Sequence, residues 1–557
     1  METVEMIAFA LRIATPFLAL ITLGICFISM NRGKRDDKAL ALLYDEAADK
    51  TYKVMFWENL IGRNENSDIV IEDDMTVSRA HAVLFNRDKD WYISDIDSKA
   101  GVFVNGQKVI KNCPLQNGDK ISLGSSVLTL KDAAKGRIRI APYDKRTFSG
   151  TMLVIMTAFY ILMLAVEAFI YIKEVEIFFP AVTFIAAMFA FYWVSCNILK
   201  RPDFELETIA LLLSGTGVVI STTFVTEWGF KQTVGAVIGM GIYSVIIWFI
   251  KVPDRSKYFR YIMAVAAVGL VASAMLFGQE KNGAANWINI GGMSLQPAEL
   301  AKVAYIFICA GTLDRIRKTR YVVELFIVTM AILYMLYDIS DIGMALVFFG
   351  TFLIAIYMWS GSWKAVTVVM LIAVAAAAVI VIMKPYIAAR FKVWGNVWEY
   401  ASDEGYQQVN ALICGASGGF FGLGAGNGNL RYIPISESDL IFSTLSEETG
   451  LFHVLILVSA IGGLVIYARS MTVKSRSVFY SMAACSASGL LVFQAALHIF
   501  GGLGMIPMTG LTLPFLSYGG TSMMACWGLL AFIKSADERT YYKKSTAEIP
   551  KKGEVLI

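Results

Sequence analysis

Long apolar stretches separated by short polar ones dominate this chain. Most are close to the about 20 residues that a helix needs to cross the roughly 30 Å hydrocarbon core of a bilayer. The first stretch starts with Glu2 and Glu5 rather than basic residues, so we interpret it as a retained anchor and not a signal peptide. The pattern predicts about thirteen membrane-spanning helices, at 6–30, 148–172, 177–199, 206–226, 232–250, 258–278, 297–313, 321–337, 341–360, 364–383, 447–468, 478–501 and 511–533.

Residues 45–132 follow a different pattern. Apolar and polar residues alternate there with a period of two, and Asn105-Gly106 and Asn117-Gly118 interrupt the alternation. Such a pattern is typical of antiparallel strands joined by tight turns. It predicts a soluble β-sandwich with strands near Tyr52–Trp57, Asp68–Ile71, His81–Phe85, Trp91–Ile96, Val102–Val104, Lys120–Leu123 and Val127–Leu130.

The segment 384–450 is polar and rich in glycine, although strongly apolar stretches flank it. It contains Gly405-Tyr406-Gln407 and Ser438-Asp439-Leu440-Ile441-Phe442. A polar loop of this length outside a membrane bundle is a place for chemistry rather than for spanning.

Composition supports a membrane protein. Hydrophobic residues make up 56% of the 557 residues and charged residues 17%, which is more apolar surface than one soluble core could bury. We therefore expect a polytopic α-helical membrane protein with an inserted all-β domain. The seven cysteines show no paired spacing, so no disulfide framework or zinc site is predicted. A net charge of +4 is too small to indicate nucleic acid binding.

Basic residues predict the orientation, because Lys and Arg resist translocation. One side, taken as cytoplasmic, collects Arg32 to Arg35, Lys135 to Arg146, Lys200 and Arg201, Lys251 to Arg260, Arg315 to Arg320, Arg469 to Arg476 and Lys534 to Lys552. The other side has isolated cations such as Lys173, Lys231 and Lys281, together with Arg390, Lys392 and Arg431 in the long loop. The loop 384–446 and the N-terminus are therefore expected outside the cell.

The β-segment resembles the forkhead-associated (FHA) domain. The resemblance is carried, in order, by Gly62-Arg63, Ser78-Arg79-Ala80-His81-Ala82, Asp95, Ser98, Gly101, Val104-Asn105-Gly106, Leu115 and Gly118-Asp119. It implies a phosphothreonine-peptide binding module in which Arg63, Ser78 and Arg79 hold the phosphate, as a guanidinium and a hydroxyl can do for a dianion. His81 is expected to pack rather than to bind.

One departure concerns the peptide side of this site. Where the FHA family has Thr/Ser-Asn before the glycine, this chain has Lys99-Ala100, and Lys99 could supply a compensating charge. The alternative is a β-domain that only mediates constitutive contacts.

Residues 203–535 resemble the SEDS family, the RodA, FtsW and SpoVE proteins of bacterial envelope growth, and the ten helices from 206 onward agree with its spacing. The motifs, in the family's order, are Asn286-Trp287-Ile288, Gly291, Gln296-Pro297-Ala298-Glu299-Leu300-Ala301-Lys302, Gly405-Tyr406-Gln407, Gly418-Gly419, Gly422, Gly424, Ser438 to Phe442, Glu447-Glu448-Thr449-Gly450 and Pro514-Phe515-Leu516-Ser517-Tyr518-Gly519-Gly520.

The resemblance implies an inverting glycosyltransferase that polymerises lipid II at the outer face of the membrane. Asp439 matches the family's essential aspartate and is the candidate catalytic base, since glycosyl transfer needs a base for the attacking hydroxyl. Arg390, Lys392 and Arg431 are candidate cations for the pyrophosphate. The alternative for Asp439 is a helix N-cap ahead of Leu440.

Other family positions are candidate substrate contacts: Trp287, Glu299, Lys302, Tyr406, Gln407 and Ser517. Glu299 and Lys302 lie on one helix face, so a structural ion pair is the alternative for them. Trp287 could instead be an interfacial belt residue. Pro514 and Gly519-Gly520 are expected to break a helix.

Four departures from the SEDS pattern stand out. The family's Gln-Pro-Asp-Leu-Gly-Thr reads Ile339 to Met344 here, its Gln-Ser pair reads Asn410-Ala411, and its Pro-Glu reads Pro434-Ile435. The fourth is the additional N-terminal material. The predicted domains are an anchor at 1–33, the FHA segment at 45–132, an extra helix pair at 145–200, the SEDS core at 203–535 and a cytoplasmic tail at 536–557.

Expected partners are lipid II, undecaprenyl-pyrophosphate-linked glycan, membrane lipids and a class B penicillin-binding protein, because the chain shows no Ser-x-x-Lys nucleophile set for cross-linking in an outward soluble domain. A phosphothreonine on another protein or on the tail, at Thr540 or Thr546, would bind the FHA segment. No ligand cluster in the sequence demands a metal ion, although Mg²⁺ or Mn²⁺ could bridge a pyrophosphate. Two other functions remain open: a transporter of lipid-linked precursors, and a scaffold with an inactive bundle.

Overall fold

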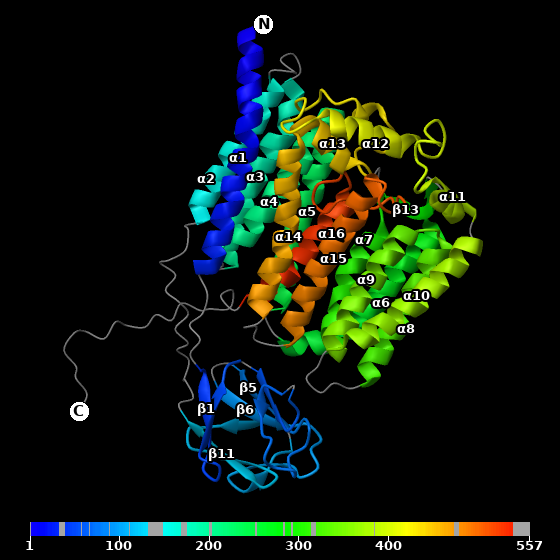
Figure 1. The fold of residues 1–557 in the computed structure, drawn as a ribbon. Helices are drawn as coiled ribbons and strands as arrows, with labels where there is room; N and C mark the ends of the chain where they lie inside the picture. Colours follow the sequence, from blue (N-terminus) through cyan, green and yellow to red (C-terminus); the bar gives the residue numbers. More distant parts are fainter. Residues whose placement is uncertain are drawn as a thin grey trace, which may run out of the picture.

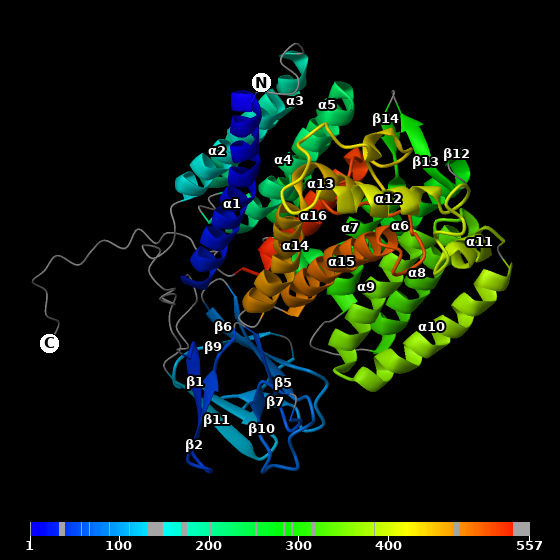
Figure 2. The same cartoon turned by 45° about the horizontal axis from the view of Figure 1, so that its top comes forward.

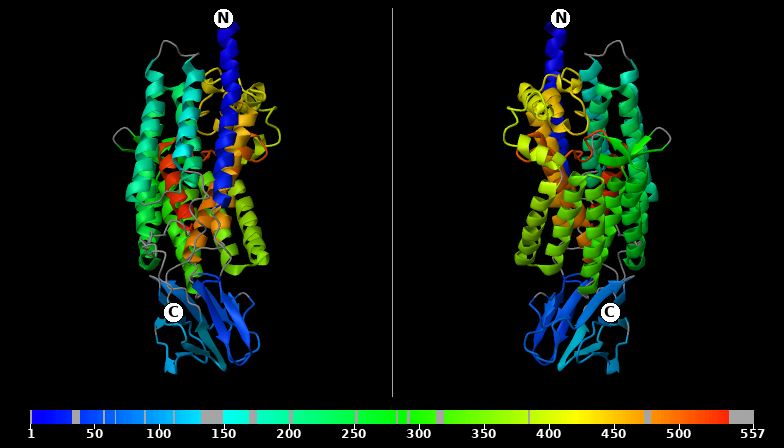
Figure 3. Two further views of the ribbon diagram at one scale, coloured as in Figure 1. Left: turned by 90° about the vertical axis from the view of Figure 1, so that its left-hand side faces the viewer. Right: turned by 90° about the vertical axis from the view of Figure 1, so that its right-hand side faces the viewer.

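The computed structural model describes residues 2–537, apart from 33–38, 57, 66, 88–89, 111, 132–148, 169–174, 200–202, 251–252, 282–283, 291–292, 313–318, 384 and 473–477. Thr540 and Thr546 therefore lie outside the described residues. The described part comprises a helical bundle and a β-sandwich (Figure 1). The sandwich lies beyond one end of the helices, and the N-terminus lies at the opposite end in every view (Figures 1 and 3).

Helices occupy the thirteen apolar stretches that the sequence predicts. They are α1 (Glu2–Arg32), α2 (Ser149–Ala168), α3 (Phe179–Trp193), α4 (Glu205–Phe224), α5 (Thr226–Ile250), α6 (Pro253–Phe277), α7 (Pro297–Thr312), α8 (Thr319–Asp338), α9 (Ile342–Ser360), α10 (Trp363–Met383), α14 (Leu451–Thr472), α15 (Val478–Gly502) and α16 (Gly520–Ser535). Among the described helices, eleven are long and apolar enough to cross a membrane. Helices α7 and α16 have only 16 residues each.

The predicted start of the last helix is wrong. The apolar stretch 511–533 is helical only from Gly520, because residues 511–519 form an irregular segment inside the bundle. The Ser517 hydroxyl stabilises this segment by accepting a hydrogen bond from Leu513 N at 2.7 Å, and Gln494 Nε2 donates to Thr512 O at 2.9 Å. Irregular backbone is tolerated at this depth where protein groups satisfy it. The predicted break at Pro514 and Gly519-Gly520 is confirmed.

The polar segment before α14 is mostly ordered into short helices rather than forming one long loop. These are α11 (Pro385–Val393), α12 (Tyr406–Ser417), the 3₁₀ turn η4 (Leu430–Tyr432) and α13 (Ile441–Thr449). A small sheet of β12 (Gln279–Lys281), β13 (Ala284–Ile290) and β14 (Met293–Leu295), which the sequence reasoning missed, lies at the same end of the bundle as α12 (Figure 2).

The β-sandwich is built from two sheets. One has the order β2 (Lys50–Val54), β1 (Ala41–Asp45), β11 (Ser126–Lys131), β10 (Lys120–Leu123), β7 (Val102–Val104) and β8 (Gln107–Lys108). The other has the order β4 (Ile69–Val70), β3 (Glu58–Gly62), β5 (Ala82–Arg87), β6 (Asp90–Asp95) and β9 (Cys113–Leu115). A common apolar core, which includes Leu43, Leu84 and Ile121, joins them.

Local sequence explains the turns of the sandwich. Asn105 and Gly106 both have positive φ, at 50° and 83°, so they form the tight turn between β7 and β8 that the asparagine-glycine pair predicts. The predicted strand 52–57 overlaps only β2, which ends at Val54, and β3 begins after it at Glu58; the domain starts at Ala41, before the predicted boundary at 45. Strand β1 was missed because its five residues directly follow the charged residues after the first helix.

Candidate functional site

A cavity of about 470 Å³ opens at the end of the bundle that carries α12 and α13. Its volume lies within the range of about 300–1,000 Å³ that is usual for ligand pockets. Its wall combines α5, α7, the β13–β14 hairpin, the start of α9, the residues before α13 and the irregular segment before α16. Its charged lining residues are Lys231, Glu299, Asp341, Arg390, Glu437 and Asp439.

Asp439 is positioned by a tight turn that precedes α13. The turn reverses at Ile435, whose φ is 67°, and Asp439 N donates to Ile435 O at 2.9 Å. The Ser517 hydroxyl donates to Ser438 O at 2.7 Å, and the Ser438 hydroxyl donates to Asp439 Oδ1 at 2.8 Å. The N-cap of α13 is Leu440, with no side-chain capping bond, so the alternative of Asp439 as the helix cap is wrong.

The electrostatic environment of Asp439 makes it a better base than a free aspartate. Its side chain is only partly accessible, from the cavity, and burial raises its pKa from 3.8 to about 6. The negative charges of Glu437 and Asp341 raise the pKa further, whereas the Ser438 hydrogen bond and Arg390 oppose the change. A carboxylate with a pKa near neutral can accept a proton at physiological pH.

Asp341 lies in the same cavity and is held by three hydrogen bonds. Its Oδ2 accepts from Asn286 Nδ2 at 2.7 Å and from Gln296 Nε2 at 3.1 Å, and its Oδ1 caps α9 by accepting from Met344 N at 3.1 Å. Asp341 was noticed in the sequence only as the retained aspartate of an altered motif. Because Asp341 is a family residue that this altered motif retains, the sequence could already have placed it in the site.

Glu437 is a further cavity residue that the sequence reasoning missed. The absence of the family's glutamate at Ile435 suggested that this loop lacks a second carboxylate. In the structure, Glu437 lines the cavity together with Asp439, and Tyr518 N fixes its backbone by donating to Glu437 O at 2.9 Å. A carboxylate two residues before Asp439 was the available signal.

Glu299 and Lys302 form an ion pair in α7, with Lys302 Nζ 2.6 Å from Glu299 Oε2. Both side chains are buried, and Lys302 also donates to Gln494 Oε1 at 2.7 Å. Glu299 lines the cavity but Lys302 does not. Thus both interpretations given for this pair, a wall of the cavity and an internal ion pair, describe part of the arrangement.

Three predicted substrate contacts, Trp287, Glu299 and Arg390, lie on the cavity wall together with the predicted catalytic residue Asp439. Arg390 Nη1 donates to Met508 O at 3.0 Å. The structure does not bring the other predicted contacts to the wall: Lys302, Lys392, Tyr406, Gln407 and Ser517.

Local contacts explain why those residues stay away from the cavity. Gln407 Nε2 donates to Pro434 O at 3.2 Å, and Lys392 Nζ lies 5.0 Å from the Tyr400 ring centroid. Tyr406 is 44% exposed and so points to solvent or lipid. Arg431 Nη2 donates to Thr223 O at 2.6 Å, which directs this cation into the bundle instead.

In the sandwich, the loops that carry the predicted phosphate contacts meet. Arg63 N donates to Ser78 O at 3.1 Å, and Lys99 N donates to Ser78 Oγ at 3.0 Å, so Arg63, Ser78 and Lys99 come from adjacent loops. Arg79 is exposed beside Ser78. A guanidinium, a hydroxyl and an ammonium group gathered on three loops form a suitable site for a dianion.

His81 is fully buried beneath these loops. Its Nδ1 accepts a hydrogen bond from Ser78 N at 3.0 Å, so Nε2 carries the proton and donates to Gly101 O at 3.1 Å. His81 therefore ties two of the loops together, and its predicted packing role is confirmed.

Comparisons with known proteins agree with both parts of the chain. Residues 204–542 match the family model of FtsW, RodA and SpoVE, described as a cell cycle protein, and residues 59–124 match the FHA domain. A probable peptidoglycan glycosyltransferase FtsW of Pseudomonas fluorescens is 30% identical over 388 residues, covering 63% of this chain and 94% of that protein. The peptidoglycan glycosyltransferase RodA of Mycobacterium tuberculosis is 26% identical over 325 residues, covering 54% and 69%.

A solved structure shares the fold of the bundle. It is described as "Structural coordination of polymerization and crosslinking by a peptidoglycan synthase complex". Its matching chain is 24% identical, with a TM-score of 0.51, and the match covers 60% of this chain and 96% of that chain.

Proposed function

This chain belongs to the FtsW, RodA and SpoVE family, and from that premise we propose that it is a peptidoglycan glycosyltransferase that polymerises lipid II. The observation that carries the proposal is the placement of Asp439 in a large polar cavity with a pKa raised to about 6. Asp439 accepts the proton of the attacking sugar hydroxyl while the bond from the donor sugar to its pyrophosphate breaks. The configuration at the anomeric carbon inverts.

Cations support the leaving pyrophosphate, because the negative charge on its oxygens grows as the glycosidic bond breaks. Arg390 and Lys231 lie on the cavity wall and supply this charge, whereas Lys392 and Arg431 contact other groups. Lys231 is partly exposed and pairs with the exposed Glu227 at 2.7 Å, so a ligand in the cavity can compete with Glu227 for its ammonium group.

A divalent cation does not fit this cavity well. No group of three or more metal-binding side chains occurs among the described residues, and both oxygens of Asp341 already accept hydrogen bonds. We therefore derive no step of the reaction through a metal ion.

The cavity faces the outside of the cell and the sandwich faces the cytoplasm. The asymmetry of basic residues supports this orientation. So does the separation of the sandwich from α12 and α13 at opposite ends of the bundle (Figures 1 and 3). Lipid-linked substrate enters from the outer leaflet in this arrangement.

Cross-linking of the product requires another protein. A class B penicillin-binding protein is the partner, in line with the polymerisation and cross-linking that the structurally similar complex combines. On the cytoplasmic side, the sandwich binds a phosphothreonine peptide through Arg63, Ser78, Arg79 and Lys99 and so brings the polymerase to phosphorylated proteins.

The test is polymerisation of lipid II by the purified full-length protein, with and without a class B penicillin-binding protein. Asp439→Ala should reduce the rate by about 10²-fold or more, the usual loss for a general base. Asp403→Ala, which removes an exposed carboxylate from the same segment, is the matched control and should keep the rate. Full polymerisation by Asp439→Ala would overturn the proposal.

Two other outcomes identify the alternatives. If the protein is a transporter, the wild type and Asp439→Ala should move labelled lipid II across vesicle membranes equally well, and neither should polymerise it. A scaffold would lose its cellular phenotype with Arg63→Ala but not with Asp439→Ala.

A further inference from the structure

Helix α1 lies outside the residues 204–542 that match the family, yet it contacts the segment that leads to Asp439. Arg12 in α1 reaches this segment, because its Nη1 donates to Leu423 O at 2.8 Å. Gly424 permits the approach, since a Cβ at this position would lie 3.1 Å from Arg12 Cζ. The contact joins two parts of the chain that are more than 400 residues apart, as the separation of 411 between Arg12 and Leu423 shows.

The contacted residues are hydrogen-bonded in turn to the helix that follows Asp439. Leu423 N donates to Glu447 O, and Gly424 N donates to Glu448 O, both at 2.9 Å. Glu447 and Glu448 belong to the last turn of α13, and α13 begins at Ile441. A short helix moves as one unit, so a restraint on its last turn also restrains Asp439 before its first turn.

A small cavity of about 30 Å³ lies between α1 and this end of α13, and its polar lining residues include Arg12, Thr15, Glu448 and His453. Glu448 and His453 are each 1% exposed. His453 Nε2 forms no hydrogen bond among the described residues. The Glu448 carboxylate lies beside the backbone N–H groups of Gly426 and Gly428 and beside Arg431, so polar groups of α1 and of the end of α13 line one small cavity.

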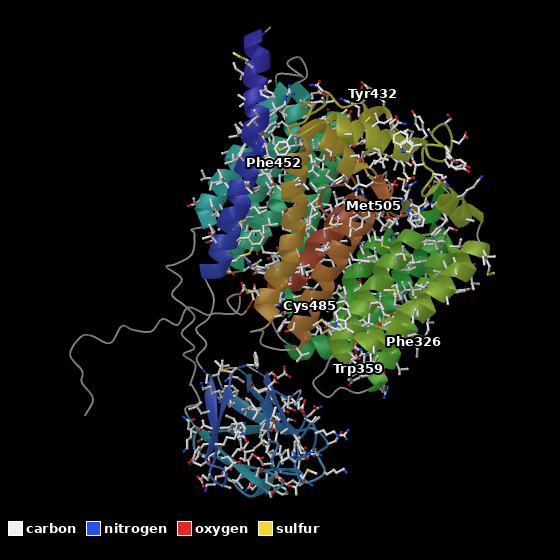
Figure 4. The ribbon with its side chains drawn as sticks, viewed as in Figure 1. Phe326, Trp359, Tyr432, Phe452, Cys485 and Met505 are labelled. Atoms are coloured by element: carbon white, nitrogen blue, oxygen red, sulfur yellow. The ribbon has the colours of Figure 1, made fainter. Side chains whose placement is uncertain are left out.

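Apolar contacts support the same junction. The Phe17 ring of α1 lies 5.4 Å from the Phe452 ring, and Phe452 stacks on Phe420 at 5.1 Å. Phe452 lies at the end of α14 that is nearest α13 (Figure 4). At the other end of α1, the buried Ser29 hydroxyl donates to Glu205 Oε1 of α4 at 2.9 Å. Helix α1 is thus attached to the bundle at Arg12 and Phe17 and again at Ser29, near its C-terminal end.

From these contacts we propose that Arg12 is a positioning residue for the polymerase: it holds the 423–424 backbone and the end of α13, and so keeps Asp439 aimed into the cavity. The proposal rests on the proposed function of Asp439. Arg12 does not line the large cavity, so it acts through α13 and not on the substrate.

The experiment uses the full-length protein in detergent with the variants Arg12→Ala, Arg12→Met and Arg12→Lys. Ile21→Ala, at a position of α1 that is 52% exposed, is the matched control. Two quantities are measured: amide hydrogen exchange of residues 418–450, and kcat and KM for lipid II polymerisation. Arg12→Met keeps an apolar chain of similar length, so it replaces Arg12→Ala if that variant fails to fold.

We expect Arg12→Ala and Arg12→Met to speed exchange at 418–428 and in α13, and to lower kcat about tenfold with KM little changed. A displacement of about 1 Å can cost this much or more. Arg12→Lys should show a smaller increase in exchange and a smaller loss of kcat, because its ammonium group can still donate to Leu423 O. Ile21→Ala should match the wild type.

The two proposals fail in different ways. Unchanged exchange and unchanged kcat in the Arg12 variants overturn the positioning role, and so does a loss that appears only in KM. If exchange responds as expected but the wild type does not polymerise lipid II, the proposed function fails and the structural role of Arg12 stands.

Discussion

Among the carboxylates of the large cavity, Asp341 and Asp439 differ in how their oxygens are held. Three donors from α9, β13 and the start of α7 fix Asp341, whereas the hydrogen bond to Asp439 comes from the hydroxyl of its neighbour Ser438. A rotating hydroxyl can also donate elsewhere, so Asp439 can change its partner during a reaction more easily. This difference favours Asp439, rather than Asp341, as the base in the proposed reaction.

The pH dependence of polymerisation tests this environment. Asp439 must be deprotonated to act as a base, and burial raises its pKa to about 6, so the rate should rise as the pH increases through about 6. Glu437→Gln removes a negative charge that contributes to this increase and should move the midpoint to lower pH. Glu404→Gln, an exposed position of the same segment, should not move it. A midpoint that stays the same in Glu437→Gln contradicts the assignment.

A second residue-scale prediction concerns the buried pair in α7. Lys302→Met leaves the Glu299 carboxylate buried without its cation, so we expect a loss of about 3–5 kcal/mol in the free energy of unfolding. The double variant Glu299→Gln/Lys302→Met removes both charges and should recover part of the loss. Thermal unfolding in detergent measures both. Equal stability of the single variant and the wild type would show that the pair contributes little.

Sequence alone identified Asp439, Glu299 and Trp287, because each belongs to a motif with several neighbouring family residues, and it identified Arg390 as one of three cations in the long loop. It did not predict that the Gln407 amide contacts Pro434 O, or that the Arg431 guanidinium contacts Thr223 O. These partners lie in segments whose mutual approach depends on the whole bundle. A motif places a residue near a site but does not show where its side chain points.

At the scale of elements, the apolar stretches predicted the helices well because their length alone matches the bilayer. The same criterion failed at 511–519, where apolar residues form irregular backbone that lines the cavity. Hydropathy does not report whether backbone groups are satisfied within a helix or by side chains such as Gln494 and Ser517. The short helices α11 to α13 were missed for a related reason, since they are too short to span a membrane and lack a long apolar run.

The packing of α9 against the irregular segment gives an element-scale prediction. A Cβ at Gly343 would lie only 2.5 Å from Thr509 O, so Gly343→Ala should push residues 509–512 away and reduce polymerisation by roughly tenfold. Gly462→Ala in α14 is the control, because a Cβ there meets nothing within 4 Å. The rates of the two variants at saturating lipid II provide the comparison. Equal rates would mean that the segment adapts without cost.

At the scale of the whole molecule, an FHA domain lies between α1 and α2, ahead of the residues that match the FtsW, RodA and SpoVE family. Arg63→Ala removes a guanidinium from the predicted phosphate site, so binding of a phosphothreonine peptide should weaken by about ten- to a hundredfold. Lys53→Ala, on the edge strand β2, is the matched control. Calorimetry with phosphorylated and unphosphorylated forms of one peptide measures the effect. Equal affinity for the two forms would favour a domain with constitutive contacts.

The strand pairing of the sandwich determines how far the loops of Ser78 and Lys99 lie from the points where the chain enters and leaves the domain. Leu42 of β1 is paired with Lys131 of β11, so the chain enters and leaves the sandwich at neighbouring positions on one end. Val102 is paired with Leu123, and Ser125 N donates to the Thr76 hydroxyl, which places the loops of Ser78 and Lys99 at the other end. The six-residue strand β11 separates the two ends by about 20 Å. With both attachments at one end, the proposed phosphate site lies at the remote end of the domain, so a captured phosphopeptide would be held about 20 Å from the points where the chain enters and leaves the sandwich.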